Sequence, residues 1–129
     1  MIERFEHVGI GVKDMEKSVA FYRDVLGYQV FSERPMSVPN SKIKKLVFMR
    51  RGDDIIELLH MPEGHPAAGN YESLGTSHIC FTVQGIQAEM DRWTALGVPQ
   101  VIPPTPTADG GMRTAFRGPD GEFIELRGK

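Results

Sequence analysis

The chain has 129 residues, fewer than the ~150 of a typical domain, so the sequence predicts a single domain. Fifteen Lys and Arg against seventeen Asp and Glu give a net charge of −2, which argues against a nucleic-acid-binding protein because such proteins carry a basic excess. Cys80 is the only cysteine, which excludes an intrachain disulfide and a cysteine-based zinc cluster. The start is charged, and no apolar run approaches the ~18 residues of a membrane span, so we expect a cytoplasmic protein without a membrane partner.

The first half of the chain reads as a strand, a helix and three further strands. Apolar alternation predicts strands over 5–12, 28–33, 43–50 and 54–60, and helical spacing of apolar residues predicts a helix over 15–26. Asp14 is the expected N-cap of this helix and Gly27 its stop signal. Residues 62–76 are rich in Gly and Pro and read as a linker.

The second half of the chain repeats this order. We expect a strand over 77–83, a helix over 86–96 that stops at Gly97, a short strand over 98–102, and strands over 112–117 and 122–127. Residues 103–111 read as a long polar loop. A loop of this length could serve a functional site or simply connect two strands, and the sequence leaves both open.

The two halves are related by an internal duplication. His7–Val12 matches His78–Val83, and Phe48–Leu58 matches Phe116–Leu126, which brings Glu57 opposite Glu125. The sequence therefore predicts an α+β chain of two tandem βαβββ modules. Their expected bounds are about 1–61 for module 1, about 62–76 for the linker and about 77–129 for module 2.

The alternation of side chains along a strand places the histidines and glutamates on matched faces. His7 lies on the opposite face from Val8 and Ile10, and Glu57 lies on the opposite face from Ile56. His78 and Glu125 take the matched places in the second half. If the two sheets curve toward each other, these four residues converge.

Two imidazoles and two carboxylates form a donor set suited to Ni, Co, Zn, Mn or Fe as divalent ions. The predicted metal ligands are His7, Glu57, His78 and Glu125. Four protein ligands leave two positions open on an octahedral ion, where a small-molecule substrate can bind. The sequence leaves open which metal binds and whether one chain or two chains supply the four ligands.

The sequence resembles the vicinal oxygen chelate superfamily, which includes glyoxalase I, methylmalonyl-CoA epimerase, extradiol dioxygenases and bleomycin-resistance proteins. The stretches that carry the resemblance are His7–Gly27, His78–Val83 and Gly118–Leu126. The resemblance implies a curved, partly closed mixed sheet with helices outside, and a homodimer. It also implies that the ligands lie on the first and fourth strands of each module, as in bacterial glyoxalase I and the epimerase.

By this resemblance we expect a divalent-metal-dependent lyase or isomerase of the glyoxalase I type. Metal-assisted proton abstraction would take place next to the carbonyl of a thiol adduct of a 2-oxoaldehyde or a related α-hydroxycarbonyl. The resemblance implies that Glu125 is the catalytic base and Glu57 its pseudo-symmetric partner, and the assignment between the two stays open. The alternatives are a methylmalonyl-CoA epimerase-like isomerase, an Fe-dependent dioxygenase and a non-catalytic small-molecule-binding protein.

Some positions depart from the glyoxalase I pattern. Glyoxalase I usually has an arginine where this chain has Gly11 and often an asparagine where it has Met61, so we expect glutathione adducts to be poor substrates. The cationic side chains between Lys42 and Arg51 are expected to blunt a solvated strand edge rather than to hold an anion. Cys80 is expected to be a small buried filler on the face that carries Glu125.

Overall fold

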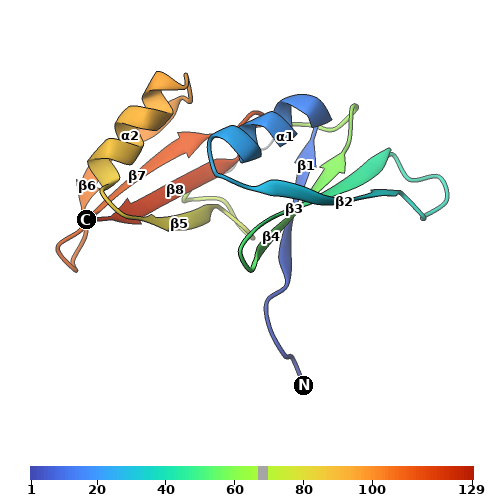
Figure 1. The fold of residues 1–129 in the computed structure, drawn as a ribbon, viewed down its shortest axis with the longest axis horizontal. Helices are drawn as coiled ribbons and strands as arrows, with labels where there is room; N and C mark the ends of the chain where they lie inside the picture. Colours follow the sequence, from blue (N-terminus) through green and yellow to red (C-terminus); the bar gives the residue numbers. More distant parts are fainter. Residues whose placement is uncertain (67–69) are drawn as a thin grey trace. The chain divides into compact units, whose positions relative to one another are not determined.

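The computed structural model describes residues 1–66 and 70–129. Over these residues the chain divides into two compact units, Met1–His65 (unit 1) and Pro66–Lys129 (unit 2). Figure 1 shows that each unit combines one helix with one sheet. Among the described residues, none of the helices has the length and apolar character needed to cross a membrane.

Unit 1 is a four-stranded mixed sheet with one helix. Its elements are β1 (His7–Val12), α1 (Met15–Asp24), β2 (Gln29–Pro35), β3 (Lys45–Arg51) and β4 (Asp54–His60). The strand order is β1-β4-β3-β2, with β1 parallel to β4 and the other neighbours antiparallel. The first and last strands of the unit are therefore neighbours, and these strands carry His7 and Glu57.

Unit 2 repeats the topology of unit 1. Its elements are β5 (Ile79–Val83), α2 (Ile86–Ala95), β6 (Gln100–Pro106), β7 (Met112–Arg117) and β8 (Phe123–Gly128). The strand order is β5-β8-β7-β6, with β5 parallel to β8. The two βαβββ modules and the α+β class predicted from the sequence are thus confirmed.

The register of the parallel strands is the same in both units. Gly9 lies opposite Glu57, and Cys80 lies opposite Glu125. Gly9 follows His7 by two residues, and Cys80 follows His78 by two residues. The duplication therefore extends to the backbone position of each histidine relative to its glutamate.

Each sheet buries an apolar face together with its helix. In unit 1, Tyr22 of α1 and Val47, Met49 and Leu58 of the sheet are at most 1% exposed. In unit 2, the almost fully buried side chains are Trp93, Phe116, Ile124 and Leu126. Burial of such a side chain stabilises the fold by about 1.5–3 kcal/mol. On β3 and β4, the neighbouring residues, Phe48 and Glu57 among them, point to the opposite face.

The helix ends follow the predicted signals. The Asp14 side chain caps α1 by accepting a hydrogen bond from the Lys17 backbone N–H at 3.0 Å. Gly27 and Gly97 follow the two helices with φ of +77° each, a conformation that glycine adopts without steric cost. These residues end the helices of the two units in the same way.

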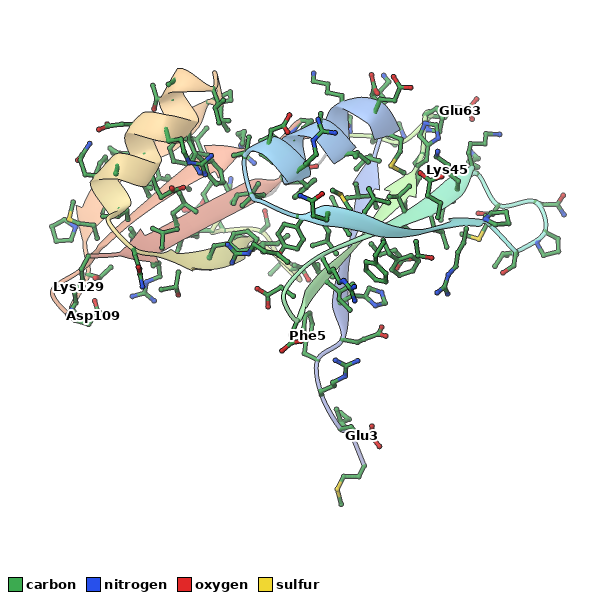
Figure 2. All side chains as sticks on the ribbon, in the orientation of Figure 1. Glu3, Phe5, Lys45, Glu63, Asp109 and Lys129 are labelled. Atoms are coloured by element: carbon green, nitrogen blue, oxygen red, sulfur yellow. The ribbon has the colours of Figure 1, made fainter. Side chains whose placement is uncertain are left out.

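The structure corrects the predicted elements at a few places. The predicted strand over 98–102 runs on to Pro106, so the expected loop over 103–111 is shortened to residues 107–111. β6 is at the edge of its sheet, where a missing proline N–H costs no ladder hydrogen bond. The first strand begins at His7 rather than at residue 5, and Phe5 lies on the extended segment before it, 82% exposed (Figure 2).

Candidate metal-binding and catalytic site

Unit 1 brings its two predicted ligands into contact. The Nε2 atom of His7 lies 2.9 Å from Oε2 of Glu57, because β1 and β4 are neighbouring parallel strands. The Nδ1 atom of the same imidazole lies 2.5 Å from Oε2 of Glu6. The imidazole edge also packs against Phe48, with ring centroids 6.0 Å apart. His7 is therefore held in place from three sides.

The His7–Glu57 pair has a separation that suits a shared cation. Nitrogen and oxygen ligands lie about 2.0–2.2 Å from a Zn²⁺-like ion, so two of them at a right angle stand about 3 Å apart. The Nε2–Oε2 distance of 2.9 Å matches this spacing. One imidazole and one carboxylate are also donors that a divalent first-row metal accepts. The residues of unit 1 thus fit the predicted metal.

Unit 2 holds its glutamate differently. Glu125 is 5% exposed, and its Oε2 atom accepts a hydrogen bond from the Tyr71 hydroxyl. Its Oε1 atom accepts a hydrogen bond from the Cys80 thiol at 3.4 Å and lies 3.9 Å from Nε of Arg127. The Nδ1 atom of His78 instead lies 2.7 Å from Oγ of Ser77. Within the described residues of unit 2, Glu125 is thus surrounded by donors rather than paired with the histidine.

The two repeats differ at the residue that lies opposite each glutamate in the parallel strand pair. Position 9 in unit 1 is a glycine, and a Cβ built there would lie 3.9 Å from Oε2 of Glu57. Position 80, its counterpart in unit 2, carries a thiol that reaches the equivalent carboxylate. Cys80 therefore gives Glu125 a hydrogen-bond donor that the glycine at the matched position cannot give Glu57.

Tyr71 is a site residue that the sequence reasoning missed. Its ring contacts His78 and Phe123 edge-on, with centroid distances of 5.2 Å and 4.7 Å, and the Arg113 guanidinium lies 5.2 Å from its centroid. Desolvation, together with the Glu125 carboxylate, raises the pKa of Tyr71 to about 12. The hydroxyl therefore stays protonated and remains a donor. Tyr71 lies in the segment predicted as a linker, where no periodicity signals a contact.

Cys80 does not behave as the buried filler that the sequence predicts. It is exposed, and its side chain is directed at Glu125. Partial desolvation and the neighbouring carboxylate raise the pKa of the Cys80 thiol to about 11. The thiol is therefore protonated at neutral pH and can donate to Oε1.

The four predicted ligands are thus placed as a contacting pair in unit 1 and as two separately partnered residues in unit 2. Among residues 1–66 and 70–129, the side chains of His, Cys, Asp and Glu form no group of three that could hold a metal ion. The assembly of His7, Glu57, His78 and Glu125 around one ion therefore stays a prediction.

The two positions that depart from the glyoxalase I pattern touch each other in unit 1. A Cβ atom built on Gly11 would lie 2.2 Å from Cε of Met61. The backbone of Met61 is held here because its N–H donates to the Val12 carbonyl at 2.8 Å, and the end of its flexible side chain lies over Gly11. The methionine therefore fills the space that a side chain at position 11 would enter.

A cavity of about 500 Å³ opens at one end of unit 2, and Thr82, Thr107, Asp109, Arg127 and Lys129 are among the residues that line it. Figure 2 shows Asp109 and Lys129 close together at this end. Arg127 joins the cavity to Glu125 through the 3.9 Å approach of its Nε atom. The cavity thus gives the Glu125 region a neighbouring space that a small molecule could enter.

The chain is similar to known proteins over most of its length. A family model described as the Glyoxalase/Bleomycin resistance protein/Dioxygenase superfamily matches residues 4–126. The ethylmalonyl-CoA/methylmalonyl-CoA epimerase of Cereibacter sphaeroides is 39% identical over 101 residues, which cover 75% of this chain and 73% of the relative. A lactoylglutathione lyase of Pseudomonas putida is 30% identical over 146 residues, covering 95% and 83% of the two chains.

A solved structure has the same fold. The fosfomycin resistance protein FosX from Listeria monocytogenes, complexed with Mn(II) and a sulfate ion, superposes with a TM-score of 0.75. The sequences are 21% identical, and the match covers 100% of this chain and 94% of FosX.

Proposed function

Because the chain belongs to the Glyoxalase/Bleomycin resistance protein/Dioxygenase superfamily, we propose that it is a divalent-metal-dependent enzyme that moves a proton next to a carbonyl group. The observation that carries this proposal is the matched placement of one histidine and one glutamate in each unit: the histidine lies at the start of the first strand in unit 1 and directly before it in unit 2, and the glutamate lies on the parallel neighbour in the same register. The related enzymes support it, since one is a lyase and the other an epimerase.

The proposed metal ligands are His7, Glu57, His78 and Glu125. The His7–Glu57 spacing supports this set, and so does the Mn(II) that FosX carries on a similar fold. The donor set suits Ni, Co, Zn, Mn or Fe. Tyr71 and Cys80 would orient Glu125 by holding its carboxylate oxygens, as hydrogen-bonded partners of metal ligands generally do.

The chemistry we propose divides the work between the metal and Glu125. A bound divalent ion supplies a Lewis acid that polarises the substrate carbonyl and so acidifies the adjacent C–H bond. Glu125 accepts this proton, breaking the C–H bond and forming an O–H bond, and then returns the proton to carbon. Return of the proton to the neighbouring carbon gives a glyoxalase-type product, whereas an epimer forms when a second acid on the opposite face, for which Glu57 is the candidate, protonates the same carbon. Glu57 is the pseudo-symmetric residue available for the same role.

Two reaction types fit this chemistry. The first is a glyoxalase I-type reaction on an adduct of a thiol other than glutathione, or on a related α-hydroxycarbonyl. The second is an epimerisation of an acyl-CoA type of thioester. The Met61 side chain lies where glyoxalase I usually has an arginine side chain at the position of Gly11. This arrangement supports both reaction types over a reaction on a glutathione adduct. A homodimer in the cytoplasm is the expected setting.

The experiment that tests the proposed function is proton exchange with solvent. Metal-loaded and chelator-treated protein are incubated in D₂O with acyl-CoA thioesters and with hemithioacetals of methylglyoxal, and deuterium incorporation next to the carbonyl is followed by NMR. We expect incorporation only with the metal-loaded protein and no consumption of oxygen. Oxygen uptake would instead indicate a dioxygenase, and intact ligands in every condition would indicate a binding protein.

A further inference from the structure

Two arginine–phenylalanine stacks lie on the sheet of unit 1, on the face opposite its buried core. The Arg34 guanidinium carbon lies 5.0 Å from the ring centroid of Phe48, and that of Arg50 lies 5.0 Å from the centroid of Phe31. The two rings are themselves in contact, with centroids 6.2 Å apart. Together these four residues form a continuous cationic and aromatic surface, which we call the Arg–Phe surface.

Strand register places the Arg–Phe surface beside the first pair of candidate ligands. Phe48 is the cross-strand partner of Glu57, so their side chains share a face of the sheet. The same phenyl ring touches the imidazole of His7, with centroids 6.0 Å apart. One ring therefore separates the candidate ligand His7 from the Arg34 guanidinium.

An irregularity in β2 gives Phe31 its place on this surface. Val30 pairs with Met49 and Ser32 with Phe48, so Phe31 is an extra residue in the strand. Such a bulge changes the direction in which a side chain points and occurs often next to functional sites. Here Phe31 meets both Phe48 and Arg50.

The charges on this surface are uncompensated. Neighbouring cations have acidic partners, since Lys45 lies 4.0 Å from Glu33 and Arg51 lies 3.8 Å from Asp54. Across the part of the chain that the structure describes, Arg34 and Arg50 make no ion pair with a carboxylate. Arg34 is held instead by the Ser32 hydroxyl, which accepts a hydrogen bond from its Nε atom at 3.3 Å. The expectation that these cations blunt a strand edge is wrong, because Lys45, Arg50 and Arg51 belong to β3, which lies between β2 and β4.

The chemistry of this arrangement favours an organic anion. A guanidinium stacked on a ring keeps its in-plane N–H groups available for a carboxylate or a phosphate, and the stacking limits the freedom it loses on binding. The Phe31 ring, 43% exposed, offers apolar contact to the carbon atoms next to the anion.

We propose that Arg34 and Arg50, stacked on Phe48 and Phe31, bind an anionic oxygen group of the substrate. The inference rests on the proposed function in that the anion belongs to the molecule whose carbonyl group reacts beside His7 and Glu57. The anionic group is a carboxylate or a phosphate, and the surface sets the specificity for substrates that carry one.

Binding of small probes to metal-free protein tests this inference without activity. Phenyl phosphate, phenylacetate and the neutral phenylacetamide are titrated into ¹⁵N-labelled protein, and backbone amide shifts are followed by NMR. We expect the two anions to shift the amides of Ser32, Phe48 and Arg50, and the neutral amide to bind more weakly by about tenfold or more, since charge-assisted hydrogen bonds contribute ~1.5–3 kcal/mol. The tighter of the two anions identifies a phosphate-bearing or a carboxylate-bearing substrate.

Three single variants separate this surface from general charge effects. Arg34→Gln and Arg50→Gln should each weaken binding of the preferred anion by about tenfold. Arg51→Gln is the matched control, because it removes the same charge from the same strand but from a residue paired with Asp54. Equal weakening in all three variants, or anion-induced shifts confined to other parts of the protein, would overturn the inference.

The proposed function can fail while this inference stands. Protein that binds no metal but loses anion binding in Arg34→Gln would refute the proposed metal chemistry and support the Arg–Phe surface. If proton exchange depends on metal but Arg34→Gln and Arg50→Gln leave KM for anionic substrates unchanged, the proposed function is supported and the role of the Arg–Phe surface is refuted.

Discussion

The hydroxyl of Tyr71 donates a hydrogen bond to the carboxylate of Glu125, 54 residues further along the chain. The donor comes from the segment between the two repeats, so it has no counterpart in the first repeat. Glu57, which occupies the matching position in unit 1, is paired with His7 instead. The two glutamates thus occupy matched positions in the repeats but have different hydrogen-bond partners. Such a difference in surroundings is one way for related carboxylates to take different roles.

Removal of this donor should weaken both the fold and the site. We expect Tyr71→Phe to lower the free energy of unfolding by about 1.5 kcal/mol, the usual contribution of a hydrogen bond to a charged group. Metal affinity should fall by about tenfold, because Glu125 loses a partner that orients it. Chemical denaturation and calorimetric titration with Ni²⁺ measure the two effects.

Ser73→Ala is the matched control for this variant. The Ser73 hydroxyl accepts a hydrogen bond from the Asn70 backbone N–H at 2.9 Å, so its loss loosens the same segment without touching Glu125. An equal loss of metal affinity in Ser73→Ala would show that the segment, and not the hydroxyl of Tyr71, matters.

The two glutamates should respond differently to the same substitution. Glu125→Gln retains an oxygen donor but removes the proton acceptor, so kcat should fall by ~10²-fold or more. Glu57→Gln should reduce metal affinity with a smaller effect on kcat. Steady-state kinetics of both variants at saturating metal make the comparison. A larger fall in kcat for Glu57→Gln would assign the base to unit 1.

Glutathione adducts should be poor substrates because Met61 fills the space above Gly11. We expect kcat/KM for the glutathione hemithioacetal of methylglyoxal to lie below ~10⁶ M⁻¹s⁻¹, a value that many enzymes reach with their own substrates. Gly11→Arg combined with Met61→Asn should improve it more than Gly11→Arg alone, since in the single variant the arginine must displace the end of the Met61 side chain. Efficient turnover by the unmodified protein would show that other residues hold the tripeptide.

Glu122 should make stability depend on pH. Burial raises the pKa of its carboxyl above the ordinary value, while a hydrogen bond from the Asp120 backbone N–H, at 3.2 Å, opposes this. The folded state therefore binds the proton more tightly than the unfolded state, and the stabilisation from protonation is lost as the pH rises through the folded pKa.

The variant Glu122→Gln is neutral at every pH and isolates this effect. The free energy of unfolding of this variant minus that of the unmodified protein should be larger at pH 7.5 than at pH 4.5. Denaturation at both pH values gives the difference, in which the contributions of the other acidic residues cancel. A difference that does not change with pH would contradict the raised pKa.

Much of the fold follows from local patterns in the sequence. The alternation of residues such as Val47 and Met49 with Phe48 identifies a strand with one buried face, and Gly27 and Gly97 mark both helix ends. β6 was harder to predict because its prolines read as a loop, although an edge strand accommodates them. The repeat of His7 and Glu57 as His78 and Glu125 identified four candidate residues by position alone.

The partners of these residues could not be predicted in the same way. Tyr71 reaches Glu125 from a segment without regular periodicity, so its direction depends on packing against His78 and Phe123. The surface formed by Arg34 and Phe31 depends on a bulge, which shifts the register of a strand by one residue. Each of these contacts is set by tertiary structure rather than by local sequence.

The most direct test of the account is the metal content of the purified protein. After loading with Ni²⁺ and gel filtration, elemental analysis should find one ion per set of His7, Glu57, His78 and Glu125. The double variant His7→Ala, His78→Ala should lose this ion, while His65→Ala, which removes a histidine outside the set, should keep it. Undiminished metal in a folded double variant, or none in the unmodified protein, would contradict the proposed site.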